Sequence, residues 1–413
     1  MKFQTTRGTR DFMPNEMQKR RHVFEKIRDV FESYGFGEVQ TPAFENLDLL
    51  TCKGSLGQEA VKDIYRFEDK SGRELGLRFD MTTPVARIIV NAKGMPKPAK
   101  LYYISNMWRY EDVTKGRWRE FWQAGVELLG SASPQADAEV LRVFIDSLLS
   151  LGLKDFTVRI NSRKILDSFA DKLKIKNRGD IFRIIDKIDK KGQDEVFKEL
   201  KKTLREEKAK QVLDFVLSQI EEARKIVDTS DIDAIMNALD EKYKCFVKPD
   251  MSIARGLEYY TGFVFECVIT GFEELGSVVG GGRYDNLIER YGGQTTPATG
   301  FSIGIERLMQ ILEKKNLIQV KNPLNVYVAS VNEKFVPEAV RISEKLRSLG
   351  IKCEYDVMSR SLSKQLDYAS AKNFRYVIFL GEREMASHVY KLRDMKTGNE
   401  KEINNISDIQ KES

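Results

Sequence analysis

Cationic and carboxylate side chains are concentrated between residues 108 and 130, which read WRYEDVTKGRWREFWQAGVELLG. Two runs rich in aromatic and β-branched residues, 101–110 and 121–129, flank a loop over 112–119 and predict an antiparallel hairpin. The loop carries three cations, Lys115, Arg117 and Arg119. Because such groups bind phosphate oxygens strongly, the loop predicts a site for a polyphosphate or the end of a nucleic acid.

The run 121–129 is expected to place polar groups on one side of a strand. Successive side chains of a strand point to opposite faces, so one face carries Phe121, Gln123, Gly125 and Glu127. Glycine has no side chain, and Gly125 is therefore expected to leave a gap between Gln123 and Glu127. This pattern predicts a floor that receives a small polar ligand.

The composition narrows the range of functions. A chain of 413 residues is long enough for two or three domains, and a net charge of +6 permits nucleic-acid binding without demanding it. The four cysteines form no CxxC pair, which favours reduced thiols and a cytoplasmic location. His22 and His388 are the only histidines, so no multi-histidine metal site is expected. No apolar run of about 18 residues occurs, so we expect no membrane span.

Changes in residue composition and hydrophobic pattern along the chain predict an α/β (α+β) fold. Residues 1–161 alternate helical and extended patterns, 162–245 are charged, proline-free and helical, and 246–322 return to glycine-rich, extended sequence. Strand and helix patterns then alternate over 323–413. We expect an antiparallel-sheet core split by a helical insertion, followed by a separate C-terminal α/β domain.

Hydrophobic spacing predicts the individual elements. Helices are expected over 17–34 and 305–315, and strands near Ile64 and Leu77, with Asp80 where the second strand gives way to a helix. In the insertion, two apolar stripes of helical spacing are formed by Ile181, Ile184, Ile185 and Ile188, and by Val212, Val216 and Ile220.

Five segments, taken in chain order, resemble motifs of the histidyl-transfer-RNA synthetase family, which belongs to the class II aminoacyl-transfer-RNA synthetases. They are RGTRDF at 7–12, the hairpin residues Arg109, Glu111, Phe121, Gln123 and Glu127, RGLEYYTG at 255–262, GGGRYD at 280–285, and GFSIGIERL at 300–308. The region after residue 323 also resembles the tail domain of that family. One position departs from the pattern, since Glu258 stands where the family usually has Asp or Ala.

The resemblance implies an architecture and a set of partners. The fold would be a class II antiparallel-sheet catalytic core with a helical insertion and a C-terminal α/β anticodon-binding domain. The partners would be L-histidine, ATP with Mg²⁺, and histidine tRNA. It also implies a homodimer, whose interface motif lies within the first 50 residues.

Formation of an aminoacyl adenylate joins a carboxylate to a triphosphate, so fixed cations must offset the repulsion between two anions. Arg109 and Arg255 are the candidates, because guanidinium groups stay charged and bind phosphate with two N–H groups. By resemblance these two arginines are catalytic and hold the α-phosphate, and Arg307 binds the γ-phosphate. The implied ATP site consists of Arg109, Glu111, Arg117, Phe121 and Arg307, with Phe121 stacked on adenine.

Selection of histidine requires a different set of side chains. A neutral imidazole offers one N–H donor and one acceptor nitrogen, which Glu127 and a tyrosine hydroxyl can match. By resemblance Glu127, Tyr259 and Tyr260 surround the imidazole, and Asp80 and Thr82 bind the α-amino group. The implied histidine site consists of Asp80, Thr82, Arg109, Gln123, Glu127, Arg255, Tyr259 and Tyr260.

The same residues are compatible with other functions. The regulatory subunit of ATP phosphoribosyltransferase shares the core and senses histidine without charging tRNA, but that family tends to lose the phosphate-binding arginines and lacks the anticodon domain. Here Arg109, Arg255 and Arg307 are present and about 90 residues follow Pro323, which favours the synthetase. A general nucleic-acid-binding protein has only mild basicity in its support. Paired tyrosines also serve as packing residues, and a basic loop can be a solvated turn.

Overall fold

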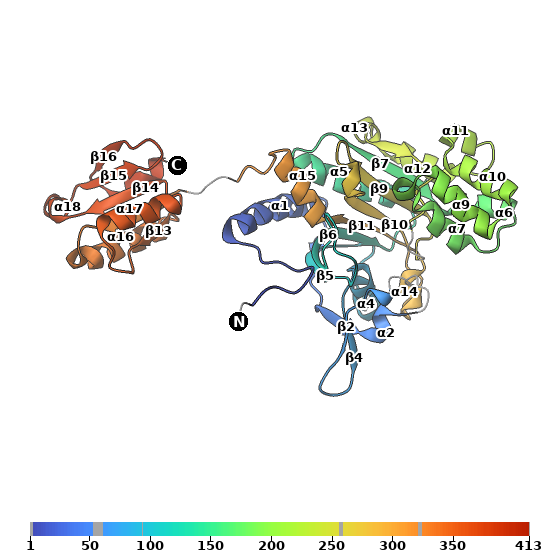
Figure 1. Cartoon of the computed structure of the whole chain (residues 1–413), viewed down its shortest axis with the longest axis horizontal. Coiled ribbons are helices and arrows are strands. Elements are labelled where there is room, and N and C mark those ends of the chain that lie inside the picture. The colour runs from blue at the N-terminus through green and yellow to red at the C-terminus, as the bar shows by residue number, and fades with distance from the viewer. Residues whose placement is uncertain (1–2, 53–60, 93, 256–258, 321–323, 413) are drawn as a thin grey trace. The chain divides into compact units, whose positions relative to one another are not determined.

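The computed structural model describes residues 3–52, 61–92, 94–255, 259–320 and 324–412 (Figure 1). Glu258, with Gly256 and Leu257 of the same motif, lies outside the described residues. The chain forms two compact units, Met1–Gln319 and Val320–Ser413.

An eight-stranded sheet organises the first unit, and its central strands are antiparallel, as predicted. The strands lie in the order β1 (Gly37–Glu38), β5 (Ala99–Trp108), β6 (Glu120–Leu129), β11 (Ala298–Gly304), β10 (Val279–Arg283), β9 (Phe263–Ile269), β7 (Phe156–Ser162) and β8 (Val247–Pro249). Only the two outer pairs, β1 with β5 and β7 with β8, are parallel. The predicted hairpin is confirmed as β5 and β6, in which Trp108 pairs with Glu120.

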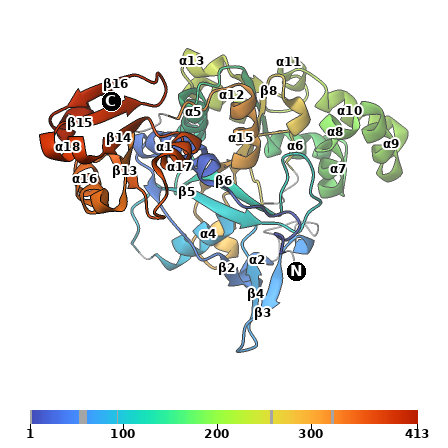
Figure 2. The same ribbon diagram turned by 60° about the vertical axis from the view of Figure 1, so that its left-hand side comes forward.

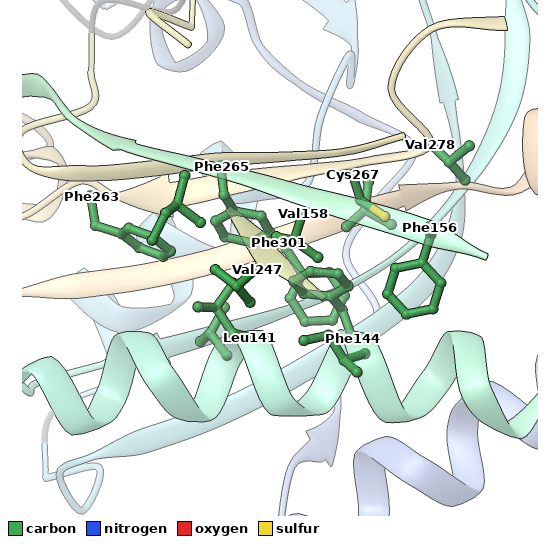
Figure 3. Packing of buried hydrophobic residues seen from close by; sticks show 14 of the residues in the cluster. Leu141, Phe144, Phe156, Val158, Val247, Phe263, Phe265, Cys267, Val278 and Phe301 are labelled. Atoms are coloured by element: carbon green, nitrogen blue, oxygen red, sulfur yellow. The ribbon is translucent and has the colours of Figure 1, made fainter. Parts of the chain in front are cut away.

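One face of this sheet packs on helix α5 (Pro134–Ser150), as Figure 3 shows. Phe144 of α5 stacks on Phe265 with ring centroids 5.1 Å apart and meets the edge of Phe301 at 5.6 Å. Helix α5 begins where the Ser133 side chain accepts the Gln135 backbone N–H, which satisfies a donor at the helix start. Helices α1 (Pro14–Ser33) and α15 (Ile305–Lys314) also contact the sheet through β6. The opposite face carries a second, smaller hydrophobic cluster, which includes Leu101, Leu129 and Val264, together with the polar residues described below.

Helix α1 begins three residues earlier than predicted. Pro14 occupies its first turn, where a missing N–H costs no hydrogen bond. A small sheet in the order β2 (Phe44–Asn46), β4 (Glu74–Leu77) and β3 (Arg66–Glu68) extends away from the large one (Figures 1 and 2). The strand expected near Ile64 is β3, which begins two residues later. Short helices α2 (Leu47–Leu50) and α14 (Leu287–Arg290) and helix α4 (Thr82–Asn91) complete this region.

The insertion consists of helices joined by short turns, as predicted. It contains α6 (Arg163–Lys172), α7 (Arg178–Ile185), α8 (Ile188–Lys191), α9 (Gln193–Thr203), α10 (Glu206–Val216), α11 (Ile220–Ala223), α12 (Ser230–Ala238) and α13 (Glu241–Lys244). Each predicted stripe is divided between two helices: α7 ends before Asp186, so Ile188 lies on α8, and Ile220 lies on α11. Buried residues of these helices and of the sheet, such as Ile188 and Ile160, belong to one hydrophobic cluster.

The second unit contains a five-stranded sheet with helices. Its strands lie in the order β13 (Lys352–Tyr355), β12 (Asn325–Ser330), β14 (Tyr376–Leu380), β15 (Tyr390–Asp394) and β16 (Glu400–Ile403). Strands β13, β12 and β14 are parallel to one another, and β15 is antiparallel to both of its neighbours, β14 and β16. Helices α16 (Val336–Ser348), α17 (Leu362–Ala371) and α18 (Glu382–Ser387) connect them, as predicted for an α/β unit. None of the helices in the described ranges combines the length and apolarity that crossing a bilayer would require.

Candidate active site

The sheet face opposite α5 carries a row of residues in register across five strands. The row runs Tyr103, Gly125, Ser302, Gly280 and Glu266. Its three middle members have no side chain larger than that of serine. Because these central residues are small, another molecule can approach the backbone of the sheet closely there. Polar and charged side chains surround this part of the sheet.

The predicted gap at Gly125 is not empty. A Cβ atom on Gly125 would lie 2.5 Å from the Tyr103 hydroxyl oxygen and 2.4 Å from the Phe301 carbonyl oxygen. The glycine therefore admits a buried tyrosine hydroxyl, and the prediction of an open gap between Gln123 and Glu127 is wrong at this position.

Glu127 lies buried on this face, with 2% of its surface exposed. Its Oε1 accepts a hydrogen bond of 2.8 Å from the Thr82 hydroxyl, and its Oε2 accepts one from the Tyr284 hydroxyl. A Cβ atom on Gly300 would lie 2.1 Å from Oε2, so only glycine fits beside this carboxylate. Its burial shows that Glu127 is not a solvated residue at a strand end.

Burial dominates the charge state of two carboxyl groups at this site, those of Glu127 and Asp80. Loss of solvent raises the pKa of Glu127 to about 8, although the Tyr284 and Thr82 hydrogen bonds oppose the rise. Burial likewise raises the pKa of Asp80 to about 6, while the Thr83 backbone N–H and Arg109 oppose it. Both groups therefore titrate nearer neutral pH than ordinary carboxyls.

Asp80 and Arg109 are brought together by pairing between two segments of the chain. The Trp108 backbone N–H donates to the Arg78 carbonyl at 3.0 Å, and Arg109 Nε donates to the Phe79 carbonyl at 3.0 Å. Asp80 Oδ1 accepts the Thr83 N–H at 3.2 Å in the first turn of α4. The strand-to-helix transition predicted at Asp80 is confirmed, and the same junction places its carboxylate within the electrostatic reach of Arg109.

Arg255 reaches the site at the end of the row that lies farthest from Tyr103, on the same face of the sheet. Its Nη1 donates to Glu266 Oε1 at 2.6 Å, and its guanidinium lies over Gly280, where a Cβ atom would come within 2.5 Å of Nη1. Burial opposes its charge, but Tyr260 and Glu266 outweigh that effect and raise the pKa of Arg255. The Tyr259 and Tyr260 rings lie 4.7 Å apart.

A second group of cations lies around Arg307 at the start of α15. Arg117 Nη1 pairs with Glu111 Oε2 at 3.1 Å, and Arg307 Nη1 donates to the Ser277 carbonyl. Burial and the repulsion of Arg117 lower the pKa of Arg307, while Glu111 opposes that shift. The Arg109 guanidinium also repels Arg307 and lies 5.0 Å from the Phe121 ring centroid. Three guanidinium groups, those of Arg109, Arg117 and Arg307, thus act on one another with only Glu111 and the smaller effect of Glu266 to oppose their repulsion at Arg307, which leaves positive charge available for an anion.

A buried ion pair fixes the beginning of α15. Arg20 Nη2 of α1 lies 2.9 Å from Glu306 Oε1, and the two side chains are 1% and 5% exposed. Glu306 Oε2 accepts the Trp122 backbone N–H of β6 at 2.9 Å. Because Glu306 directly precedes Arg307, this network sets the position of that arginine relative to the hairpin.

Comparison with known proteins identifies the family of this chain. The family model described as histidyl-tRNA synthetase matches residues 8–308, and one described as an anticodon-binding domain matches 325–411. The chain belongs to the histidyl-tRNA synthetase family.

Relatives cover the chain almost completely. A histidine–tRNA ligase from Pyrococcus furiosus is 46% identical, and the match spans 98% of each chain. The crystal structure of histidyl-tRNA synthetase from Nostoc sp. PCC 7120 matches all of both chains at 28% identity with a TM-score of 0.82. A structure from Bacillus halodurans, titled an ATP phosphoribosyltransferase regulatory subunit/histidyl-tRNA synthetase, matches 91% of this chain and 98% of its own at 25% identity with a TM-score of 0.75.

The family motif at the start of the chain supports the base of the cationic loop. The Gly8 carbonyl accepts the Arg119 backbone N–H at 2.8 Å, and Arg109 N–H donates to the Arg119 carbonyl at 2.9 Å. The Arg10 guanidinium lies 4.4 Å from the Phe12 ring centroid and 5.3 Å from that of Trp118. Segment 8–12 and the hairpin therefore form one structural unit, although they are distant in sequence.

Three residues of this histidyl-tRNA synthetase family site were not predicted to have a role. Tyr284 donates to Glu127, Tyr103 fills the space beside Gly125, and Glu266 pairs with Arg255. The register of the hairpin would have revealed Tyr103. Tyr284 is 157 positions from Glu127, so no local pattern relates the two, whereas Glu266 is 11 positions from Arg255 on the strand that follows it. Gln123 lies on β6 between Phe121 and Gly125, and its side chain therefore shares their face of the sheet.

Proposed function

We propose that this member of the histidyl-tRNA synthetase family is a histidine–tRNA ligase. It activates L-histidine with ATP to histidyl-adenylate and transfers histidine to the 3′ end of histidine tRNA, releasing AMP and pyrophosphate. The observation that carries the proposal is the grouping of Arg109, Arg117 and Arg307 beside the buried carboxyl groups of Asp80 and Glu127.

In the first step, a carboxylate oxygen of histidine attacks the α-phosphorus of ATP. The bond from that phosphorus to the oxygen bridging to the β-phosphorus breaks, and pyrophosphate leaves. Arg109 and Arg255 hold the α-phosphate and offset the charge that builds on its oxygens, so both serve as catalytic residues. No protein nucleophile is required, since catalysis consists of positioning and electrostatic stabilisation.

Histidine is bound between the two buried carboxyl groups. Thr82 and Tyr284 fix Glu127, whose remaining acceptor positions take the imidazole N–H. Tyr259 and Tyr260 line the ring, Asp80 receives the α-ammonium together with Thr82, and Gln123 holds the backbone end. A site of this kind rejects analogues that lack the polar atoms by roughly 10⁴- to 10⁵-fold.

ATP occupies the side of the hairpin nearer α15. Phe121 stacks on adenine, Glu111 and Arg117 bind other parts of the nucleotide, and Arg307 binds the γ-phosphate. Among the described residues, no three His, Cys, Asp or Glu side chains come together to hold a metal ion. Mg²⁺ would accompany ATP chiefly through its phosphate oxygens.

We propose the division into domains that the sequence predicts. Residues 1–161 and 246–322 form the catalytic core, 162–245 a helical insertion, and 323–413 the anticodon-binding domain. The match of 325–411 to the anticodon-binding model supports the last assignment. We place the protein in the cytoplasm and expect a homodimer.

Adenylate formation can be tested by histidine-dependent exchange of pyrophosphate into ATP, measured with each of the twenty amino acids. We expect exchange with histidine alone, because the site reads both imidazole nitrogens. A regulatory protein that senses histidine would bind it without catalysing exchange. Binding of histidine with no exchange would therefore support that alternative and contradict the proposed ligase.

Removal of the second unit should separate the two steps of the reaction. A chain ending at Gln319 keeps every candidate site residue, so we expect nearly normal pyrophosphate exchange. Charging of tRNA should fall by about 100-fold or more, since two linked binding modules gain that much over one. Circular dichroism checks that the shortened chain is folded. An equal loss of exchange and charging would show that the unit is structural and not a recognition module.

A further inference from the structure

A chain of alternating charges connects the helical insertion to Arg255. Arg255 pairs with Glu266 at 2.6 Å, Glu266 Oε2 lies 3.7 Å from Arg159 Nη2, and the same Arg159 nitrogen pairs with Asp189. Asp189 belongs to α8 of the insertion, whereas Arg159 and Glu266 belong to the sheet. The insertion thus reaches the proposed catalytic arginine through three successive ion pairs, Asp189–Arg159, Arg159–Glu266 and Glu266–Arg255.

The sheet holds the middle of this chain in place. Arg159 of β7 is in register with Glu266 of β9, which is in register with Gly280 of β10, beneath the Arg255 guanidinium. The Arg159, Glu266 and Arg255 side chains are only 17%, 19% and 21% exposed. Partly buried pairs are screened less by water and salt than exposed pairs, so a change at one member is felt at the next.

The backbone at Arg255 is also held from the insertion. Arg163, at the start of α6, donates from Nη1 to the Ala254 carbonyl at 3.0 Å, and its guanidinium lies 4.3 Å from the ring centroid of Phe182 on α7. Arg255 itself has φ of +50°, a conformation that a residue with a side chain adopts only when its surroundings impose it. The surroundings of Arg255 therefore include the first helices of the insertion.

Arg159 divides its charge among three carboxylates, Glu266, Asp250 at 3.5 Å, and Asp189. If a neutral residue replaced Arg159, Glu266 would have Arg255 as its one cationic partner in this chain of contacts. Glu266 would then hold Arg255 more tightly. Arg255 would then be less available to a phosphate. The competition between Arg159 and Arg255 for Glu266 thus controls how far the proposed catalytic guanidinium is free to bind substrate.

We propose that Arg159 is a positioning residue, which holds Glu266, sets the orientation of Arg255, and is itself held by Asp189 of the insertion. This inference rests on the proposed role of Arg255 in adenylate formation. It makes α8 a structural support of the catalytic step, so that the position of the insertion affects the rate of histidine activation.

The test compares pyrophosphate exchange by the full-length protein and its variants Arg159→Met, Asp189→Asn and Asp180→Asn. Arg159→Met should lower kcat about 3- to 30-fold, the range typical of changes along a coupling network, with KM for ATP and histidine little changed. Asp189→Asn should lower kcat by less, up to about 5-fold, because half-exposed ion pairs are weak. Asp180 is the matched control: it pairs with Arg183 at 2.6 Å and is 52% exposed, against 56% for Asp189. Asp180→Asn should leave exchange unchanged.

A second arm tests whether Arg159 acts through Arg255. In the Arg255→Lys background, Arg159→Met should cause little further loss of kcat, because the group that it positions is already replaced. An equal loss in both backgrounds, or a normal rate for Arg159→Met, would overturn the inference. A normal rate for Asp189→Asn, or an equal loss for Asp180→Asn, would overturn the link to the insertion. Normal exchange by Arg255→Ala would instead refute the proposed role of Arg255. Thermal unfolding of each variant shows whether the fold is retained.

Discussion

Arg255→Ala is expected to lower histidine-dependent pyrophosphate exchange by about 10²- to 10³-fold, the usual cost of removing one preorganised group that stabilises transition-state charge. The guanidinium lies over Gly280 and is held there by Glu266, so little reorganisation is needed when ATP binds. Alanine removes the charge from a position where water cannot readily replace it. The loss should appear mainly in kcat, because the charge on the α-phosphate grows during the reaction.

Arg142→Ala is a suitable control for this variant. Arg142 is also an ion-paired arginine of the first unit, 20% exposed against 21% for Arg255, and its partner Asp240 lies away from the row of site residues. We expect Arg142→Ala to retain normal exchange, and both variants to keep the circular dichroism spectrum of the unmodified protein. Near-normal exchange by Arg255→Ala would refute its phosphate-binding role.

Glu127→Gln should lower kcat/KM for histidine by about 10- to 100-fold, since a hydrogen bond to a charged group contributes roughly 1.5–3 kcal/mol. The substitution keeps the shape of the side chain but replaces one acceptor oxygen by a donor. An NH₂ group would face the Tyr284 hydroxyl, the Thr82 hydroxyl or the imidazole N–H, each of which needs an acceptor. ATP affinity should change little, because Glu127 lies on the histidine side of the site.

The pH profile provides a sharper measurement of the same role. Burial raises the pKa of Glu127 to about 8, so the carboxylate that accepts the imidazole N–H becomes more abundant as pH rises toward that value. In the unmodified protein, kcat/KM for histidine should therefore increase by up to about tenfold per pH unit below about pH 8 and then level off.

Glutamine does not titrate, so Glu127→Gln should lose this rise and keep only the part that comes from the imidazole of the substrate. Glu45→Gln is the control: Glu45 is 8% exposed and pairs with Arg87 at 2.7 Å, outside the proposed histidine site. It should keep the full pH dependence. Identical profiles for Glu127→Gln and the unmodified protein would exclude Glu127 from imidazole recognition.

Local patterns in the sequence were sufficient to predict the hairpin, the helix that carries Arg307, and the α/β unit after residue 323. Alternation of side chains also places Phe121, Gln123 and Glu127 on one face correctly, because the register of a strand depends on neighbouring residues. The division of the insertion stripes between α7 and α8, and between α10 and α11, was not predicted. A stripe with helical spacing continues across a short break when the successive helices pack on the same core.

Contacts between distant segments were beyond the reach of spacing arguments. Tyr284 and Glu127 are 157 positions apart, and Arg20 and Glu306 are 286 apart. No periodic pattern relates such residues, and resemblance to a family named the residues proposed to bind the ligands but not those that hold them in place. Arg159 was missed for this reason, because its contact with Glu266 joins distant segments. Tyr103 and Glu266 were missed although their partners are nearer, Gly125 on the paired strand and Arg255 11 positions away, because spacing within one element does not show contacts between elements.

The hydrophobic cluster that includes both Ile160 of the sheet and Ile188 of the insertion has a consequence for how this protein can vary. Helices that share their interior with the catalytic sheet are not an exchangeable cassette, because their removal would expose apolar surface of the sheet to water. Changes of length or sequence in the insertion are best tolerated on its solvated side. Natural diversity and engineering in this region are therefore expected to alter surface charge while preserving the buried isoleucines.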